Sequence, residues 1–216
     1  MFDIVLHMGT LVATVIVFYK EILQILKTPR AIMLLIVASI PTAIIGFTVA
    51  DFIETHMWNL HVASMSLCVT GTFLWFTKYI RPRSIVLEAP LFSYISVQNA
   101  FWIGLAQGFA LIPGISRSGI TITTALFLKT GRRDAASFSF ILSIPAILGA
   151  LCLKLLKTPS LSEHDLSLFL TGFSLSMVVG AFALLVLIRI VLNGKLYQFS
   201  WYCFVIGILS IFLAYF

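Results

Sequence analysis

The sequence predicts an all-α integral membrane protein that crosses the bilayer several times. Of its 216 residues, 60% are hydrophobic and only 10% are charged, and the mean hydropathy is +1.08. A soluble domain, by comparison, carries about 25% charged residues. The apolar runs are long and continuous, whereas the strands of a membrane barrel alternate between apolar and polar positions. Composition and run length together therefore predict a polytopic helical bundle.

Most of the apolar segments have the roughly 17–25 residues that a membrane-spanning helix needs. We expect them at about 2–20, 31–50, 60–80, 97–112, 117–130, 137–157, 166–192 and 198–216. Pro41 and Pro145 lie inside their segments, and we expect each proline to kink its helix without ending it. No segment has the composition of a second, soluble domain. The whole of 1–216 is therefore expected to form a single integral membrane domain.

The segments at 97–112 and 117–130 are short and lie back to back across Pro113 and Gly114. They form either one broken pair that dips into the membrane or two thin spans. Unwound backbone is tolerated at membrane depth only where it is buried in protein or lines a cavity. Short segments interrupted by glycine and proline are typical of binding sites in membrane proteins. The interruption therefore indicates a binding site.

Basic residues predict the orientation of the chain. When the segments alternate in direction, the main clusters fall on one side: Lys20, Lys27 and Arg30; Lys78, Arg81 and Arg83; Lys129, Arg132 and Arg133; Arg189 and Lys195. The other side receives Asp51, Glu54, Glu163 and Asp165, with Lys154 and Lys157 as exceptions. Basic connections are retained in the cytoplasm, so the 113–118 turn should face the outside or a cavity open to it. The net charge of +6 thus reflects topology and does not indicate a nucleic-acid partner.

Arg117 is the most informative single residue, because it places a charge inside a run that is otherwise membrane-embedded. Such a charge costs at least about 2.5–3.5 kcal/mol. Arg117 has hydroxyl residues close to it in sequence: Ser116, Ser118, Thr121 and Thr123. A helix that begins here presents free N–H groups and the positive end of its dipole, which bind phosphate well. The guanidinium adds a planar fork that suits phosphate oxygens. The pattern predicts an anion site, with phosphate as the expected ligand.

The residues around Arg117 have candidate roles in this site. Ser116 and Ser118 can donate hydrogen bonds, or one of them can act as a nucleophile. Thr121 shares the helical face of Ser118. Gly119 keeps the turn slim enough for a ligand to approach the backbone. Gln107, one turn before the break, either reaches the ligand or forms a hydrogen bond between helices.

Each of these residues also has a purely structural interpretation. Hydroxyls in membrane helices often bond a carbonyl one turn back. Gly114 and Gly119 can serve close helix packing, and Arg117 can extend to the membrane interface. No acidic residue lies near Arg117 in sequence to form a local ion pair. We interpret His7 as a packing or interfacial histidine. The sequence has no Walker loop, no paired carboxylates and no cluster with metal-ligand spacing.

The run from Gln107 to Ile122 closely resembles the signature of the undecaprenyl-diphosphatase family, the bacitracin-resistance membrane phosphatases of bacteria. The similarity extends to 138–147 and 2–10 and covers essentially the whole chain. It implies hydrolysis of undecaprenyl diphosphate to the monophosphate in the bacterial inner membrane, which recycles the lipid carrier for cell-wall synthesis and confers bacitracin resistance.

The same resemblance implies a fold and a set of site residues. The fold is an inverted repeat of helices with two re-entrant hairpins, the second of them at 97–130. By resemblance, Arg117 binds the diphosphate, and Ser116, Ser118 and Thr121 line the site. Gly114, Gly119 and Gln107 are expected to contact the substrate.

The chain departs from the family pattern in one respect. Family members carry a Glu-rich motif and a Ser-Ser-x-x-x-His stretch upstream of the point at which this sequence begins. Those carboxylates would bind the Mg²⁺ or Ca²⁺ that the family implies, and that histidine would serve as an acid or base. We therefore predict no metal ligand in this chain. We expect a misassigned start or a truncated remnant that binds diphosphate poorly and hydrolyses it slowly or not at all.

Two other functions are left open by the residues. Broken helices around a central site are common in transporters, so a polyprenyl-phosphate transporter or flippase is an alternative. It would move lipid without releasing inorganic phosphate. A non-catalytic membrane scaffold would leave Arg117 unexplained. The expected partners are a polyprenyl diphosphate and membrane lipids, and the sequence is compatible with a homo-oligomer.

Overall fold

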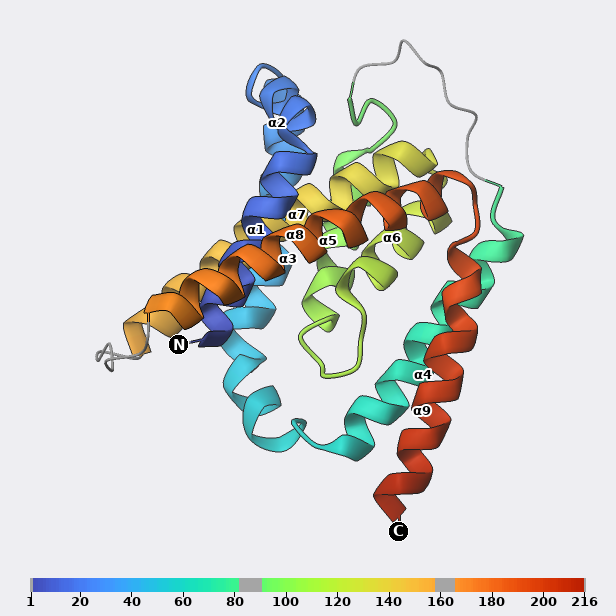
Figure 1. Ribbon diagram of the computed structural model, residues 1–216. Helices are drawn as coiled ribbons and strands as arrows, with labels where there is room; N and C mark the ends of the chain where they lie inside the picture. Colours follow the sequence, from blue (N-terminus) through green and yellow to red (C-terminus); the bar gives the residue numbers. More distant parts are fainter. Residues whose placement is uncertain (1, 82–90, 158–165, 216) are drawn as a thin grey trace.

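The computed structural model describes residues 2–81, 91–157 and 166–215, and within these ranges the regular structure is helical (Figure 1). Five of the described helices are long and apolar enough to cross a membrane, or six if a bent pair is counted as one span. The prediction of an all-α polytopic membrane protein is therefore confirmed. The inverted repeat and the single-domain boundaries stay predictions.

The helices follow the predicted apolar segments closely. They are α1 Phe2–Val17, α2 Tyr19–Leu26, α3 Pro29–His56, α4 Leu60–Phe76, α5 Val97–Phe109, α6 Arg117–Phe127, α7 Arg132–Lys157, α8 Leu166–Leu192 and α9 Phe199–Tyr215. Helices α3 and α7 continue through Pro41 and Pro145, so neither proline ends its helix. The first predicted segment differs, because the chain bends by 74° between α1 and α2. Lys20 consequently lies in a helix and not in a loop.

The helices pack in pairs that join distant parts of the sequence. Helix α1 lies along α8, α4 along α9, and α3 against α5. Figure 1 shows α4 and α9 side by side as one arm of the molecule. Small residues bring the backbones together: a Cβ atom on Gly104 of α5 would lie 2.7 Å from the Cα of Ala38 in α3. Such close approach is typical of helix packing in membranes.

Helices α5 and α6 form a re-entrant hairpin. They contain 13 and 11 residues, which corresponds to lengths of about 20 and 16 Å. A hydrocarbon core is about 30 Å thick, so neither helix can cross it. In Figure 1 both helices extend from the same end of the molecule, and the turn between them lies in its middle. Of the two predicted arrangements, the broken pair is correct and the two thin spans are wrong.

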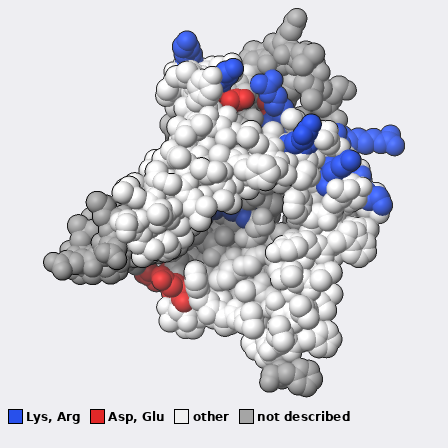
Figure 2. Space-filling model, viewed as in Figure 1, with Lys and Arg blue, Asp and Glu red and all other residues white. Residues whose placement is uncertain are grey.

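Lys and Arg side chains gather at one end of the molecule (Figure 2). Arg133 and Glu21 join α7 to α2 at this end, with 3.7 Å between their side-chain N and O atoms. Asp51 and Glu54 lie near the opposite end, in the last turns of α3. Arg83, Glu163 and Asp165 lie outside the described residues, as do the side chains of Lys154 and Lys157. The described charges agree with the predicted asymmetry, while the cytoplasmic assignment of the basic end stays a prediction.

Candidate functional site

The turn of the hairpin depends on Gly114. Its φ angle is +87°, a left-handed conformation that favours glycine. A Cβ atom at this position would also collide with the carbonyl group of Ala63 and lie 2.9 Å from its Cα in α4. Gly114 therefore both reverses the chain and lets the turn press against α4. The structure supports the packing interpretation of this glycine.

Thr70, a residue of α4, also holds the turn against that helix. Its hydroxyl donates to the carbonyl oxygen of Gly114 at 3.2 Å and accepts from the backbone N–H of Ser116 at 3.1 Å. Thr70 is buried, so these bonds are shielded from competing donors and acceptors. Sequence reasoning did not identify Thr70, because it lies in another helix and no motif links it to the hairpin.

Ser116 is the N-cap of α6. Its hydroxyl oxygen accepts from the backbone N–H of Gly119 at 3.1 Å, which is the usual capping geometry. A Cβ atom on Gly119 would lie 2.9 Å from that same oxygen, so Gly119 leaves room for the cap. Among the described residues, the next two amides of α6, those of Arg117 and Ser118, have no hydrogen-bond partner. The predicted helix start with free N–H groups is therefore present, and its binding of an anion stays a prediction.

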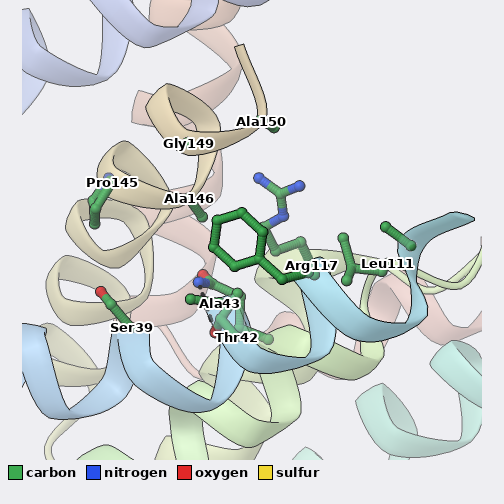
Figure 3. Close-up of a pocket in the computed structure, with 13 residues that line it drawn as sticks. Ser39, Thr42, Ala43, Leu111, Arg117, Pro145, Ala146, Gly149 and Ala150 are labelled. Carbon is green, nitrogen blue, oxygen red and sulfur yellow. Dashed lines mark hydrogen bonds between the residues drawn. The ribbon is translucent and has the colours of Figure 1, made fainter. Parts of the chain in front are cut away.

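Arg117 is the first residue of α6, and its side chain extends from the turn into the space between α3 and α7 (Figure 3). The side chain is partly buried. Within the described ranges, its guanidinium makes no ion pair and no hydrogen bond. A cation at membrane depth without a counter-ion is costly, and this cost predicts an anionic ligand.

Arg117 lines a cavity of about 640 Å³. The polar and ionisable side chains around it are His7, Glu54, Arg117, Ser118, Ser139 and Ser143. Ser139 is only 3% exposed, and its hydroxyl has no hydrogen-bond partner among the described residues. A buried hydroxyl in that state is satisfied by a water or by a ligand. The cavity thus combines one permanent cation with hydroxyls, an imidazole and a carboxylate.

Arg117 also lines a second, mostly apolar cavity of about 190 Å³ between α3 and α7. Gln107 lies on its wall and is only 2% exposed. The Nε2 of Gln107 donates to the Thr42 hydroxyl at 3.3 Å, and that hydroxyl donates in turn to the carbonyl oxygen of Gly104 at 2.8 Å. Because the Thr42 hydroxyl donates its proton to Gly104, it can only accept a hydrogen bond from Gln107. The Nε2 of Gln107, and not its Oε1, therefore faces Thr42. The Gln107 Oε1 is left without a partner in the described structure.

The structure distributes the predicted site residues over several surfaces. Arg117 lines both cavities, Ser118 lines the larger one and Gln107 the smaller one. Ser116 and Gly119 face a different groove, on the side of α6 toward α8 and α9, and Ser118 lines that groove as well. The helix–helix interpretation of Gln107 describes its amide nitrogen, which donates to Thr42 of α3. Contact of Gln107 with a ligand stays a prediction, and its Oε1 has no partner among the described residues.

The threonines of α6 lie away from these cavities. Thr121 is fully buried, and its hydroxyl donates to the carbonyl oxygen of Arg117 at 2.8 Å. This is the local bond that hydroxyls in membrane helices commonly form. Thr123 is also fully buried, and its hydroxyl has no partner in the described ranges. The arrangement indicates that Thr121 supports the first turn of α6.

Four polar residues of the larger cavity are absent from the predicted site. From the sequence we interpret His7 as a packing histidine, use Glu54 only to indicate orientation, and give Ser139 and Ser143 no role. The resemblance contains a signal for three of them, because His7, Ser139 and Ser143 lie in the similar stretches at 2–10 and 138–147. Nothing in the sequence linked Glu54 to Arg117, since α3 and α6 are brought together only by the fold.

The described residues do not fit a resident divalent cation. Mg²⁺ and Ca²⁺ take about six or more oxygen ligands, with carboxylates prominent among them. In the described ranges, no group of three or more His, Cys, Asp or Glu side chains is placed to hold an ion. Of the described residues around the larger cavity, Glu54 alone is a carboxylate, and Arg117 lines the same cavity. The described residues therefore provide no support for the expected Mg²⁺ or Ca²⁺, which stays a prediction.

Comparison with known proteins gives consistent matches along the chain. Residues 1–209 match the sequence model of the family described as bacitracin resistance protein BacA. An undecaprenyl-diphosphatase of Carboxydothermus hydrogenoformans is 40% identical over 214 residues, which cover 96% of this chain and 80% of the relative. One of Desulforapulum autotrophicum is 38% identical and covers 97% and 83%. One of Thermotoga petrophila is 38% identical and covers 95% and 81%.

Proposed function

Because the chain belongs to the bacitracin resistance protein BacA family, we propose that it is a membrane phosphatase that converts undecaprenyl diphosphate to undecaprenyl phosphate and inorganic phosphate. The family membership confirms the resemblance of the 107–122 run. By this activity the protein recycles the lipid carrier of cell-wall synthesis and confers resistance to bacitracin. We further propose that it lies in the bacterial inner membrane with its basic end in the cytoplasm.

One observation supports this function most directly: the guanidinium of Arg117, at the start of α6, has no partner within the described part of the chain. The amides of Arg117 and Ser118 have no partner among the described residues, and the helix dipole adds positive charge at the same place. A diphosphate carries the negative charge and the oxygen acceptors that the guanidinium and the two amides lack. The adjoining cavity is large enough to admit a headgroup, at about 640 Å³.

The residues of the cavity can carry out the hydrolysis of a diphosphate. Water attacks the terminal phosphorus, the bond from that phosphorus to the bridging oxygen breaks, and the polyprenyl monophosphate leaves. Arg117 and the two amides bind the phosphate oxygens and stabilise the charge that develops on them in the transition state. The hydroxyls of Ser118 and Ser139 lie on the walls of the same cavity and can orient the terminal phosphate.

The attacking water must transfer a proton as it bonds to phosphorus. Among the described residues that line the cavity, His7 and Glu54 are the side chains able to accept it, because Arg117 stays protonated. They come from α1 and α3, whereas Arg117 comes from α6. We assign the proton transfer to this pair.

Phosphate release tests the function. Purified chain in detergent, supplied with undecaprenyl diphosphate, should release inorganic phosphate and form undecaprenyl phosphate in equal amounts. Reconstituted vesicles with the substrate in one leaflet distinguish the alternative, because a flippase would redistribute the lipid without releasing phosphate. Redistribution with no phosphate would therefore replace the proposed function by transport.

The two serines on either side of Arg117 should respond differently to replacement. Ser116→Ala removes the N-cap, so we expect the free energy of unfolding to fall by about 1 kcal/mol. Ser118→Ala leaves the cap intact and removes one hydrogen bond to phosphate, so we expect kcat to fall about tenfold with unchanged stability. Thermal unfolding and phosphate release measured on both variants separate these roles. A loss of kcat beyond about a thousandfold in Ser118→Ala would instead identify Ser118 as the nucleophile.

A further inference from the structure

The groove between α3 and α7 has small side chains on both walls. Helix α3 contributes Ala43, Gly46 and Ala50, and helix α7 contributes Ala146, Gly149 and Ala150. Each set recurs at helical spacing, so it forms a stripe along one face of its helix. Figure 3 shows Ala146 and Gly149 of α7 facing the helix that carries Ala43, with Arg117 beside the space between the two helices.

Small residues in membrane helices usually bring two backbones into contact, as Gly104 does with Ala38 in this protein. The glycines of the groove do not. A Cβ atom on Gly149 would meet no atom within 4 Å, and one on Gly46 would first meet the Leu111 Cδ1 at 4.0 Å. Packing therefore does not explain these glycines, which instead border open space.

The inner part of the groove carries a polar signal as well. Arg117 and Ala150 line both this groove and the larger polar cavity, so the two spaces adjoin at these residues. The Oε1 of Gln107 is buried on the groove wall without a partner among the described residues, and the hydrogen bond from its Nε2 to Thr42 determines its orientation. A buried acceptor in that state is satisfied by a donor such as a water, so Gln107 marks the polar inner end of the groove and does not itself bind hydrocarbon.

We propose that this groove binds the first isoprene units of the lipid substrate and is the route by which the diphosphate reaches Arg117 from the bilayer. This inference rests on the proposed function. The occupant is a polyprenyl chain, because most of the wall is apolar while Arg117 lies where the groove adjoins the polar cavity. Gly149 and Ala150 are exposed, which leaves the outer side open to lipid. The cavity, of about 190 Å³, holds only part of the hydrocarbon, and the rest extends into the membrane.

On this proposal, Gly46 and Gly149 determine specificity for a long polyprenyl chain, because the lack of a side chain at each position leaves space for it. Gly149→Leu should fill part of the groove from α7, since a Cβ at this position meets no described atom within 4 Å. We expect kcat/KM for undecaprenyl diphosphate to fall about tenfold or more. Isopentenyl diphosphate has a single five-carbon unit and can approach through the polar cavity, so its kcat/KM should change less than about twofold. Gly46→Leu should have the same effect from the opposite wall.

Two control variants accompany this experiment. Gly149→Ala adds one carbon at the same position and should have a smaller effect than leucine. Val178→Phe adds bulk to α8, where Val178 is 62% exposed and lies outside both cavities. It should leave both substrates unaffected. Equal losses on both substrates in Gly149→Leu, or no loss on either, would overturn the proposal.

Binding supplies a measurement that does not depend on turnover. Undecaprenyl phosphate should raise the midpoint of thermal unfolding of the unmodified chain and of Val178→Phe, but not of Gly149→Leu, since a ligand stabilises the state that binds it. If phosphate is released from neither substrate while this pattern holds, the proposed hydrolysis fails and the groove assignment stands. The same midpoint shift in all three proteins would refute the groove.

Discussion

Replacing Arg117 with alanine is expected to lower kcat/KM for undecaprenyl diphosphate by about 100- to 1,000-fold, the usual effect of removing a donor that stabilises transition-state charge. Arg117→Lys keeps the charge but loses the planar fork, so we expect a loss of about tenfold or more. Phosphate release over a range of substrate concentrations measures both variants. The alanine variant should lose more activity because it also lacks the charge.

Stability distinguishes a binding role of Arg117 from a structural one. The guanidinium has no partner among the described residues, so Arg117→Ala should leave the midpoint of thermal unfolding unchanged or raise it. Arg189→Lys is a matched control, because Arg189 is exposed in the last turn of α8 at the basic end. It should retain full activity. Undiminished phosphate release in Arg117→Ala would remove this arginine from the site.

Gly114→Ala is expected to have the largest effect on stability. The alanine must adopt a φ of +87°, which costs about 1–3 kcal/mol. Its Cβ would also collide with the carbonyl group of Ala63, and relieving that overlap costs about 1–3 kcal/mol more. The hairpin turn then moves away from α4 and carries Ser116 away from Thr70. We expect a large fall in the unfolding midpoint together with loss of phosphate release.

Gly149→Ala is the matched control for this experiment. It is the same chemical change in a helix, at a position where the new Cβ meets no atom within 4 Å. The midpoint should stay the same or rise slightly, because alanine favours the helix more than glycine does. Equal midpoints for Gly114→Ala and Gly149→Ala would show that the contact with Ala63 does not restrain the turn.

Sequence reasoning identified the parts of this protein that depend on local chemistry. Apolar run length determines which segments cross a membrane, and the helices of the structure follow those segments closely. Likewise, the break at Pro113 and Gly114 indicated where α6 begins, although the capping role of Ser116 was not predicted. The charge of Arg117 at membrane depth indicated an anion site without knowledge of any neighbour.

Other features were decided only by the tertiary structure. Gly119 illustrates the difference: the motif indicated room for a ligand, while the fold uses that room for the Ser116 cap. The pairing of Thr70 with the hairpin turn, and the meeting of His7 and Glu54 around one cavity, join helices that are far apart in sequence. Helical periodicity shows which side chains share a face but not which helix that face contacts.

The sequence by itself therefore determined the membrane class, the family and the charged centre of the site, because these depend on composition and on a contiguous motif. The tertiary structure alone decided the two cavities that meet at Arg117, the open groove at Gly46 and Gly149, and the supporting bonds from α4. The physical reason is that cavities and cross-helix hydrogen bonds are properties of pairs of surfaces. Which surfaces pair depends on how all the helices pack together, and no local pattern encodes that arrangement.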